Sequence, residues 1–360
     1  MRHFIGIMAG TSLDGLDFAL CQLNDGRWTV NKSHHVEYPD QLLHEILMLA
    51  RSQSNNLELV ASADRQWAEF TSTTLLEWAT TEGIDLGQIE AIGSHGQTIR
   101  HAPQEWTVQI GDPNIMALKT GCTVVADFRR ADIAAGGQGA PLVPIVHDQL
   151  FSDGRWACLN LGGIANVTLR DHSGVLIGFD TGPANTLSDQ LAQSLLNLPY
   201  DANGDQARSG TIQTELLHAL LSDDYFEKPA PKSTGPEKFS IQWWNTFDIQ
   251  TLSAQDQLAT AIELTAVSVC DQLTQHPHLD TLWVCGGGVH NRYLMDRIRH
   301  HSPIKAIQTT DTVGISTDAM EAFAFAVLAQ RRLDKLPSNC PSVTGAKHEV
   351  LLGGIYESIR

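Results

Sequence analysis

The chain has 360 residues, of which 42% are hydrophobic and 18% are charged, a composition typical of a globular protein and far from the disordered or collagen-like extremes. Its formal net charge of −17, from 24 basic and 41 acidic residues, argues against nucleic acid and anionic membranes as partners, because these need a concentrated basic surface. Single hydrophobic cores rarely grow beyond about 250–300 residues, so the length predicts two lobes.

The cysteines and the N-terminus give no sign of secretion. Six cysteines are scattered without a CxxC pair, and Cys21, Cys158 and Cys285 fall within apolar, strand-like runs. This pattern is typical of reduced thiols in the core of a cytosolic protein. The first apolar run is too short for a signal peptide, and no run of about 18 apolar residues occurs. We therefore expect a soluble, cytoplasmic protein.

The first predicted element is a β-hairpin. Strand Phe4–Met8 is followed by a turn rich in glycine and serine and by strand Asp17–Leu23. The same pattern returns in the middle of the chain, where strand Trp156–Leu161 leads through two glycines into strand Asn166–Leu169. This recurrence predicts an α/β fold of two lobes that derive from one ancestral fold.

Three short apolar strands end in polar, glycine-containing loops. Ile89–Gly93 precedes SHGQT, Val175–Phe179 precedes DTGPAN, and Leu279–Cys285 precedes GGGVHN. Because ligands bind at the carboxyl edge of the sheet in α/β domains, we expect these loops to share one cleft. Apolar residues spaced three and four apart predict helices at Gln41–Arg51, Leu59–Thr80, Asn185–Leu196, Ala254–Gln275, Arg292–His300 and Asp318–Arg332. Glu227–Phe239, rich in Pro, Lys, Gly and Ser, predicts an irregular, lid-like loop.

Nucleotide-binding signals of two common kinds are missing: the sequence has neither GxxxxGK[ST] nor a GxGxxG between a strand and a helix. The first hairpin tip, GTSLDGLD at 10–17, offers glycine backbone, two hydroxyls, and carboxylates that suit hydrated Mg²⁺. It is either a phosphate clamp or a simple Asp-Gly turn. The second tip, LGGIAN at 161–166, has the same architecture, and such a pair can grip a triphosphate.

The triple glycine after the third strand suits a flat adenine or ribose laid against the backbone, the alternative being tight packing of strand on helix. The histidines show no metal-ligand spacing, so no direct metal ligand is assigned. The predicted nucleotide-binding residues are Gly10, Thr11, Ser12, Leu13, Asp14, Gly15, Leu16, Asp17, Gly162, Gly163, Gly286, Gly287, Gly288 and Asn291.

A collinear set of motifs runs the length of the chain: GIMAGTSLDGLD, GSHGQTI, DFRRADIAAGGQGAPLVP, NLGGIANVT, GFDTGPANTL, PKSTGPEKF, CGGGVHN, DAMEAFAFA and PSVTGA. By these motifs the chain resembles the anhydro-N-acetylmuramic acid kinases, within the superfamily of actin, sugar kinases and heat-shock ATPases. It departs from the family pattern at Ala9, Ala184 and Pro236, which concerns fine loop geometry.

The resemblance implies two duplicated actin-like, ribonuclease H-like lobes with a nucleotide cleft between them. Residues 1–140 are then the N-terminal lobe, with the first phosphate hairpin and the sugar-binding loops. Residues 141–360 are the C-terminal lobe, with the second hairpin, the catalytic aspartate and the adenine site, and the extreme C-terminus packs back on the first lobe. It also implies a homodimer.

The implied reaction belongs to peptidoglycan recycling. ATP, with Mg²⁺, phosphorylates 1,6-anhydro-N-acetylmuramic acid while water opens the 1,6-anhydro ring, giving N-acetylmuramic acid 6-phosphate and ADP. Phosphoryl transfer depends mainly on positioning and charge neutralisation, so the chain must supply a clamp and one base. Two other readings stay open: a kinase of the superfamily that acts on a simple hydroxyl, and a nucleotide switch, which would hydrolyse ATP without sugar.

Asp180 is the candidate base. It ends a predicted buried strand, so its carboxylate should emerge at the ligand-binding edge, although an N-cap or Asx-turn aspartate would sit there equally well. The resemblance implies that Asp180 deprotonates the water that attacks the anomeric carbon, while the departing O6 captures the γ-phosphoryl group.

The substrate's lactyl carboxylate calls for a planar, bidentate cation, and the resemblance places Arg129 there, with Arg130 as an outward structural residue. Gln97, Thr98 and Glu321 are the other predicted substrate-binding residues. His95 is expected to have a structural role, and Lys232 is implied to guard the cleft.

Overall fold

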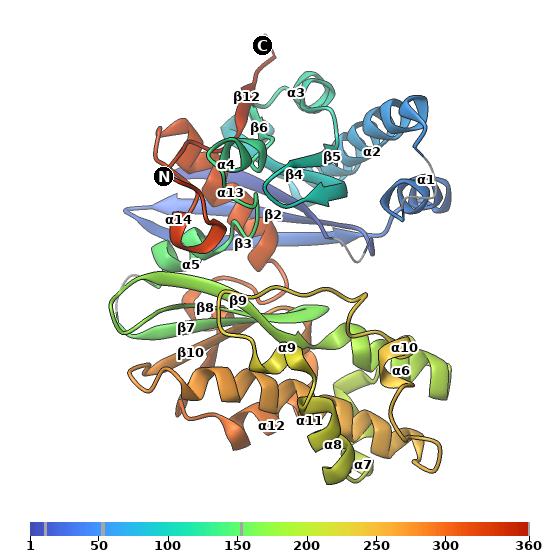
Figure 1. Cartoon of the computed structure of the whole chain (residues 1–360). Helices are drawn as coiled ribbons and strands as arrows, with labels where there is room; N and C mark the ends of the chain where they lie inside the picture. The colour runs from blue at the N-terminus through green and yellow to red at the C-terminus, as the bar shows by residue number, and fades with distance from the viewer. Residues whose placement is uncertain (11–12, 52–54, 152–153, 359–360) are drawn as a thin grey trace. The chain divides into compact units, whose positions relative to one another are not determined.

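The computed structural model describes residues 1–10, 13–51, 55–151 and 154–358, so Thr11 and Ser12 of the first hairpin tip lie outside the described residues. The chain forms two compact units (Figure 1). Unit 1 comprises Met1–Leu150 and Val313–Arg360, and unit 2 comprises Phe151–Thr312. No helix in the described ranges combines the length and apolar character that a membrane span requires.

The boundaries of these units differ from those of the predicted lobes, 1–140 and 141–360, because unit 1 also contains the C-terminal segment. Pro144–Leu150 forms the helix α5 within unit 1, and the segment after Thr312 returns to unit 1 with the helix α13 (Met320–Leu333) and the strand β12 (Gly354–Tyr356). The difference arises because α13 packs on β1 (Arg2–Ala9), a tertiary contact that the local sequence pattern does not reveal.

The sheet of unit 1 has the strand order β12-β6-β4-β1-β2-β3, with β5 pairing with β4. β1 and β3 both run antiparallel to β2, whereas β4 runs parallel to β1 and to β6. The strands not yet delimited are β2 (Leu16–Asn24), β3 (Arg27–Val36), β4 (Ile89–Ala102), β5 (Trp106–Ile110) and β6 (Val124–Ala126).

The sheet of unit 2 repeats this plan with the strand order β11-β10-β7-β8-β9. β8 is antiparallel to β7 and β9, and β10 is parallel to β7 and β11, as in the corresponding strands of unit 1. This repeated order confirms the predicted fold class, two duplicated actin-like α/β lobes. The strands are β7 (Trp156–Leu161), β8 (Ile164–Arg170), β9 (Leu176–Pro183), β10 (Thr281–Cys285) and β11 (Ala306–Thr309).

All six predicted helices are present, with ends that differ by no more than two residues. They are α1 (Asp40–Ala50), α2 (Leu57–Glu82), α6 (Asn185–Leu196), α11 (Ala254–Thr274), α12 (Arg292–His301) and α13. Shorter helices are α3 (Pro113–Thr120), α4 (Arg130–Ala134), α7 (Asp205–Ser209), α8 (Thr214–Leu221), α9 (Asp224–Glu227), α10 (Ile241–Trp244) and α14 (Pro341–Thr344). As predicted, the segment after Glu227 is irregular as far as Ser240.

Two of the predicted loops are strand instead. β4 continues through SHGQT to Ala102, and β9 includes Asp180 and ends at Pro183. The extension of β4 is stabilised by antiparallel pairing with β5, in which Gln97 lies opposite Ile110. Asp180 likewise pairs with Asn166 of β8. Glycines weaken the alternating pattern of both segments, so the sequence alone predicted that the strands ended earlier.

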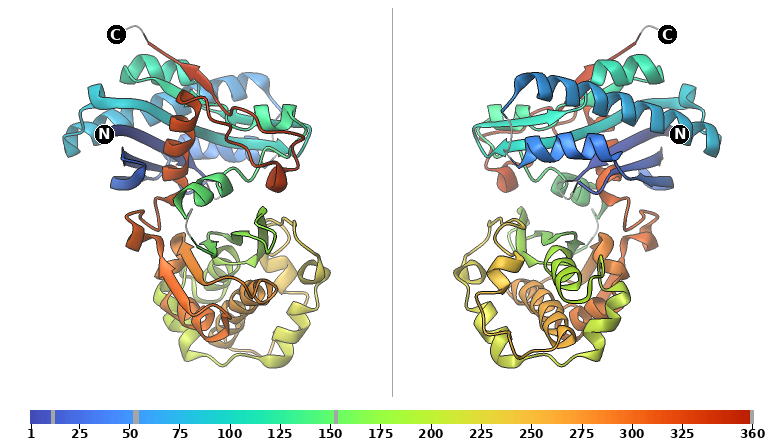
Figure 2. Two further views of the ribbon diagram at one scale, coloured as in Figure 1. Left: turned by 90° about the vertical axis from the view of Figure 1, so that its left-hand side faces the viewer. Right: turned by 90° about the vertical axis from the view of Figure 1, so that its right-hand side faces the viewer.

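The two faces of the unit 1 sheet are covered by different parts of the chain (Figure 2). Ile5, Ile7 and Ile92 pack with Trp67 and Leu75 of α2 in one core. The opposite face of β1 and β4 is covered by α13. Glycines allow this helix to approach closely, because a Cβ on Gly6 would lie 1.7 Å from the carbonyl oxygen of Ala322, and one on Gly93 would lie 2.0 Å from that of Phe325.

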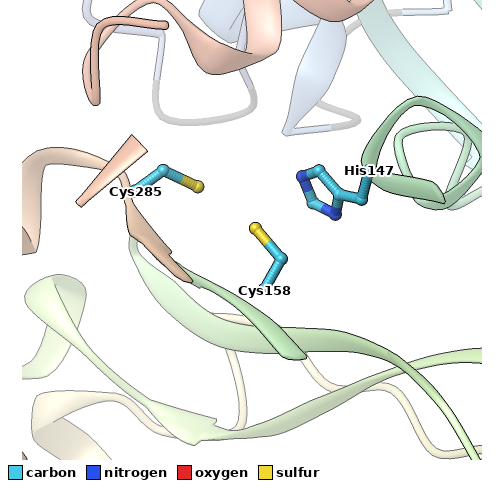
Figure 3. Close-up of side chains that lie close together, drawn as sticks. All are labelled: His147, Cys158 and Cys285. Atoms are coloured by element: carbon cyan, nitrogen blue, oxygen red, sulfur yellow. The ribbon is translucent and has the colours of Figure 1, made fainter. Parts of the chain in front are cut away.

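In unit 2, α6, α11 and α12 bury the sheet face that carries Leu159 and Leu161. Cys158 and Cys285 belong to the neighbouring strands β7 and β10 and are fully buried free thiols (Figure 3, which also labels His147, a residue of unit 1). Burial, followed by the proximity of Cys285, holds the pKa of Cys158 well above its usual value. The burial of both thiols and the raised pKa of Cys158 agree with the prediction that these cysteines are reduced residues of the core.

Replacing Gly6 with alanine is expected to destabilise the protein by about 1–3 kcal/mol or more, because the added methyl group must push α13 away from β1. Urea unfolding followed by circular dichroism measures the change. Ser33→Ala, at an exposed position of β3, is the control and should change the stability by no more than about 0.5 kcal/mol. Equal stability of the two variants would contradict the tight packing.

Candidate functional site

Arg129 stands at the N-terminus of α4, and its guanidinium is held on two sides by neutral acceptors. Its Nε and Nη2 donate to Nε2 of His95, at 3.1 and 2.8 Å. Its Nη1 donates to the carbonyl oxygen of Gly139, at 2.8 Å. Arg130 instead is exposed and pairs with Asp127. The two arginines therefore differ as predicted, one turned inward and one outward.

The ring of His95 is buried and neutral. Burial, and then the charge of Arg129, hold the pKa of His95 well below its usual value. Because Nε2 accepts from Arg129, the ring proton sits on Nδ1, which donates to the carbonyl oxygen of Ala9 at 3.3 Å. His95 thus joins the end of β1 to Arg129, which agrees with the structural role predicted for it.

The positive charge of Arg129 has no direct counter-ion within the described residues. Burial lowers its pKa to about 10, an effect that the negative charge of Glu321 partly opposes. Glu321 lies in the first turn of α13, so the helix that covers the sheet also brings an acidic group near the guanidinium. A partly buried cation with only neutral acceptors is stabilised by an anion that binds beside it.

The side chain of Gln97 lies next to the first hairpin. Its Nε2 donates to the carbonyl oxygens of Gly10 and Thr98, at 3.0 and 3.2 Å. Its Oε1 accepts from the hydroxyl of Tyr38 at 2.8 Å. Thr98 Oγ1 accepts from Gln109 at 3.1 Å. Gln97 therefore tethers the hairpin, and its predicted contact with a sugar stays a prediction.

The described part of the first hairpin tip is tightly folded. Leu13 has a positive φ of 61°, and its N–H donates to the carbonyl oxygen of Gly10 at 3.4 Å. A Cβ on Gly15 would lie 2.1 Å from the carbonyl oxygen of Val36. Beyond this turn Leu16 is buried as the first residue of β2.

Two predicted carboxylates stand near this tip. Oδ1 of Asp17 lies 2.8 Å from Nδ1 of His35, within the distance of a hydrogen bond or an ion pair. Burial raises the pKa of Asp17, and the nearby Asp14 and Asp318 raise it further, while His35 opposes the rise. The acidic groups therefore lie close enough to interact, but their role toward a metal ion stays a prediction.

Asp180 of β9 is held by hydrogen bonds to both its side chain and its backbone. Its Oδ2 accepts from the backbone N–H of Thr234 at 2.9 Å. Its own backbone is fixed as well, since its N–H donates to Lys232 and its carbonyl oxygen accepts from the hydroxyl of Tyr225, at 3.0 and 2.7 Å. Burial raises the pKa of Asp180 to about 6, against the bond from Thr234.

The segment after α9 is thus attached to the candidate base. Nζ of Lys232 donates to the carbonyl oxygens of Tyr225 and Phe226, at 3.2 and 3.3 Å, and lies 4.7 Å from the ring centroid of Tyr225. The hydroxyl of Thr234, beside Asp180, is buried and has no hydrogen-bond partner within the described residues. A ligand bound at Asp180 would offer it one.

The second hairpin tip and the triple glycine meet in unit 2. The N–H groups of Asn185 and Thr186, at the start of α6, donate to the carbonyl oxygens of Gly162 and Gly163, at 3.1 Å each. A Cβ on Gly288 would lie 2.6 Å from Cβ of Leu161. Tight packing, the alternative weighed for these glycines, is therefore present.

A pocket of about 350 Å³ lies next to the residues that follow the glycine segment. Gly287 begins a short 3₁₀ turn, and Asn291 follows it as the N-cap of α12, accepting from Leu294 N–H at 2.9 Å. Val289 and Arg292, on either side of Asn291, line the pocket together with Arg208. The predicted contact of these glycines with a nucleotide stays a prediction.

Sequence reasoning missed several residues of these two sites. Tyr225 and Thr234 reach Asp180 only through tertiary folding, although the KST motif pointed to that region. Arg208 stands in a short helix without a motif, so no sequence signal identified it. Arg292 directly follows GGGVHN, so that motif could have predicted that it lies near the glycine segment.

The repeated sheet order defines the class, an actin-like protein of two α/β lobes. The model of the family described as anhydro-N-acetylmuramic acid kinase matches residues 2–358, and the chain belongs to this family.

Two relatives that carry this description agree with the assignment. The protein of Aliivibrio fischeri is 42% identical over 99% of both chains. That of Pasteurella multocida is 44% identical over 98% of this chain and 96% of its own. A solved structure, an activator of 2-hydroxyisocaproyl-CoA dehydratase from Clostridium difficile with bound ADPNP, covers 93% of this chain and 96% of its own at 10% identity, with a TM-score of 0.48. The assignment does not rest on that structure.

Gly286→Ala is expected to weaken ATP binding at least severalfold. The backbone of Gly286 has a positive φ of 85°, and a Cβ would lie 2.4 Å from Asn160 Oδ1, so the segment must shift. Isothermal titration calorimetry measures the affinity. Gly174→Ala is a matched control, because φ there is 84° but no atom lies within 4 Å of the added Cβ. A similar loss in both variants would trace the effect to backbone strain instead.

Proposed function

We propose that this chain uses ATP and Mg²⁺ to convert 1,6-anhydro-N-acetylmuramic acid, together with water, into N-acetylmuramic acid 6-phosphate and ADP, as a step of peptidoglycan recycling. Membership in the family supports the kinase activity and the sugar substrate. The six free cysteines fit the reducing cytoplasm, where this step would take place. The family resemblance further implies a homodimer.

The observation that carries the proposal is the Arg129 guanidinium. It is partly buried among neutral acceptors, and no carboxylate of the described residues lies within ion-pair distance. Nη1 and Nη2 each carry a second N–H, so two donors are left for a ligand. A carboxylate fits this fork in a bidentate manner, which the lactyl group of the muramic sugar supplies and a simple hexose does not.

Asp180 is proposed to act as the general base. Its backbone and Oδ2 are fixed by Lys232, Thr234 and Tyr225, which leaves lone pairs on the carboxylate to accept a proton from water. The water oxygen attacks the anomeric carbon and the bond from that carbon to O6 breaks. O6 then bonds to the γ-phosphorus of ATP as the bond from that phosphorus to ADP breaks, so ADP leaves. The water proton stays on Asp180 until product leaves.

The nucleotide would be held by the two hairpin tips and the glycine segment. The backbone at Gly162 and Gly163 and the pocket beside Asn291 support this part of the proposal. Asp14 and Asp17 are oxygen donors of the type that Mg²⁺ prefers, and they would help to hold the ion next to the nucleotide. When bound, the ion supplies charge neutralisation of the transferring phosphoryl group.

Mass spectrometry of the product tests the proposal. With 1,6-anhydro-N-acetylmuramic acid, ATP and Mg²⁺, the sugar should gain one phosphoryl group and one water. Asp180→Asn should lower the rate by about 10²-fold or more, the size typical of a lost general base. Asp171→Asn, a turn carboxylate of the same unit that accepts from Ser173 and Val175, is the matched control. A gain of the phosphoryl group alone would mean a kinase without ring opening, and sugar-independent ATP hydrolysis would mean a nucleotide switch.

The pH dependence gives a second test. A base with a raised pKa is inactive below that value, so kcat/KM should fall about tenfold per pH unit below about 6 and level off above it. The profile is measured in constant-ionic-strength buffers with saturating nucleotide. An acidic limb near 4, the ordinary range of an exposed aspartate, would contradict the buried base.

A further inference from the structure

The loop that supplies Gly139 to Arg129 has little means of holding its own shape. Residues 136–139 read Gly-Gly-Gln-Gly, and Gly136 and Gly139 have positive φ values of 87° and 76°. Glycines have the largest backbone entropy to lose on folding, so this loop requires anchors outside itself.

Asp132 provides most of these anchors. It is fully buried in α4. Its Oδ2 accepts from the N–H of Gly139 at 2.8 Å, and its backbone carbonyl oxygen accepts from that of Gly137 at 2.9 Å. A Cβ on Gly137 would lie 2.2 Å from Asp132 Oδ2, so the loop wraps directly around the carboxylate.

The other oxygen of Asp132 is held by the C-terminal segment. Its Oδ1 accepts from Oγ1 of Thr344 at 2.7 Å and from Nδ2 of Asn339 at 2.9 Å. The backbone of Thr344 contributes too, since its carbonyl oxygen accepts from the N–H of Gln138 at 2.9 Å. The motif PSVTGA, which the proposed chemistry leaves without a role, thereby completes the anchoring of the loop.

We infer that Asp132, locked by Thr344, is a positioning residue that gives the enzyme its preference for a sugar bearing a carboxylate. It acts through Gly139, whose N–H it fixes and whose carbonyl oxygen orients Nη1 of Arg129. Neither Asp132 nor Thr344 touches the sugar. This inference rests on the proposed function, in which Arg129 binds the lactyl carboxylate.

Asp132→Asn is the informative change, because it keeps the size of the side chain. The three donors at the two carboxylate oxygens cannot all be accepted by an amide, since one of its ends is itself a donor. Either Gly139 or the C-terminal segment is therefore released. Thr344→Val removes one donor while keeping the shape, and provides a milder variant if Asp132→Asn does not fold.

The test compares kcat/KM for 1,6-anhydro-N-acetylmuramic acid with that for 1,6-anhydro-N-acetylglucosamine, which lacks the lactyl carboxylate. The wild type should prefer the acid by about 10- to 100-fold, the worth of a charge-assisted hydrogen-bonded pair, and Arg129→Lys should lose most of this preference. Asp132→Asn should lower the ratio about tenfold and Thr344→Val about threefold, mainly through KM for the acid.

Asp64→Asn is the matched control, because Asp64 of α2 also accepts from a glycine N–H in unit 1, that of Gly111 at 2.7 Å. It should lower the melting temperature without changing the ratio. A preserved ratio in both Asp132→Asn and Thr344→Val, or an equal loss for both sugars, would overturn the inference. A wild type that does not prefer the acid would instead contradict the proposed role of Arg129.

Discussion

The close contact between α13 and the strands β1 and β4 is the constraint on which unit 1 depends. Gly6 and Gly93 leave no room for a side chain, so the helix backbone lies directly on the sheet. Because α13 follows the whole of unit 2 in the chain, this contact also brings the C-terminal segment back to unit 1. It sets Glu321 near Arg129 and lets Thr344 reach Asp132.

The two candidate sites, one in each unit, differ in their electrostatics. Around Arg129, partial burial among neutral acceptors leaves a cation without a direct counter-ion in the described part of the chain, so the site favours an anion. Around Asp180, burial disfavours the charged carboxylate, which raises its pKa to about 6 and makes it a better proton acceptor at neutral pH. In both, the backbone of a neighbouring loop provides the orientation, through Gly139 in one and Thr234 in the other.

Much of the fold was predictable because it is encoded locally. The hairpins and the six longer helices follow apolar periodicity, and the recurrence of one hairpin indicated the duplication. The length of β4 was not predictable, because it depends on pairing with β5. Motifs predicted Arg129 and Asp180 as site residues, which stays a prediction. The partners that orient them, such as Gly139 and Tyr225, are distant in sequence and meet them only in the folded chain. The resemblance implied that the extreme C-terminus packs on the first lobe, but not that the return to unit 1 already begins at Val313, before α13.

The discontinuity of unit 1 has a consequence for biosynthesis. A ribosome delivers all of Phe151–Thr312 before it delivers α13, so unit 2 can fold while unit 1 still lacks the helix that covers one face of its sheet. During that interval Trp28, whose ring packs against Phe323 of α13 in the finished protein, lacks this contact on the nascent chain. The N-terminal part of unit 1 is thus made first, but its sheet is completed only when α13 has been made.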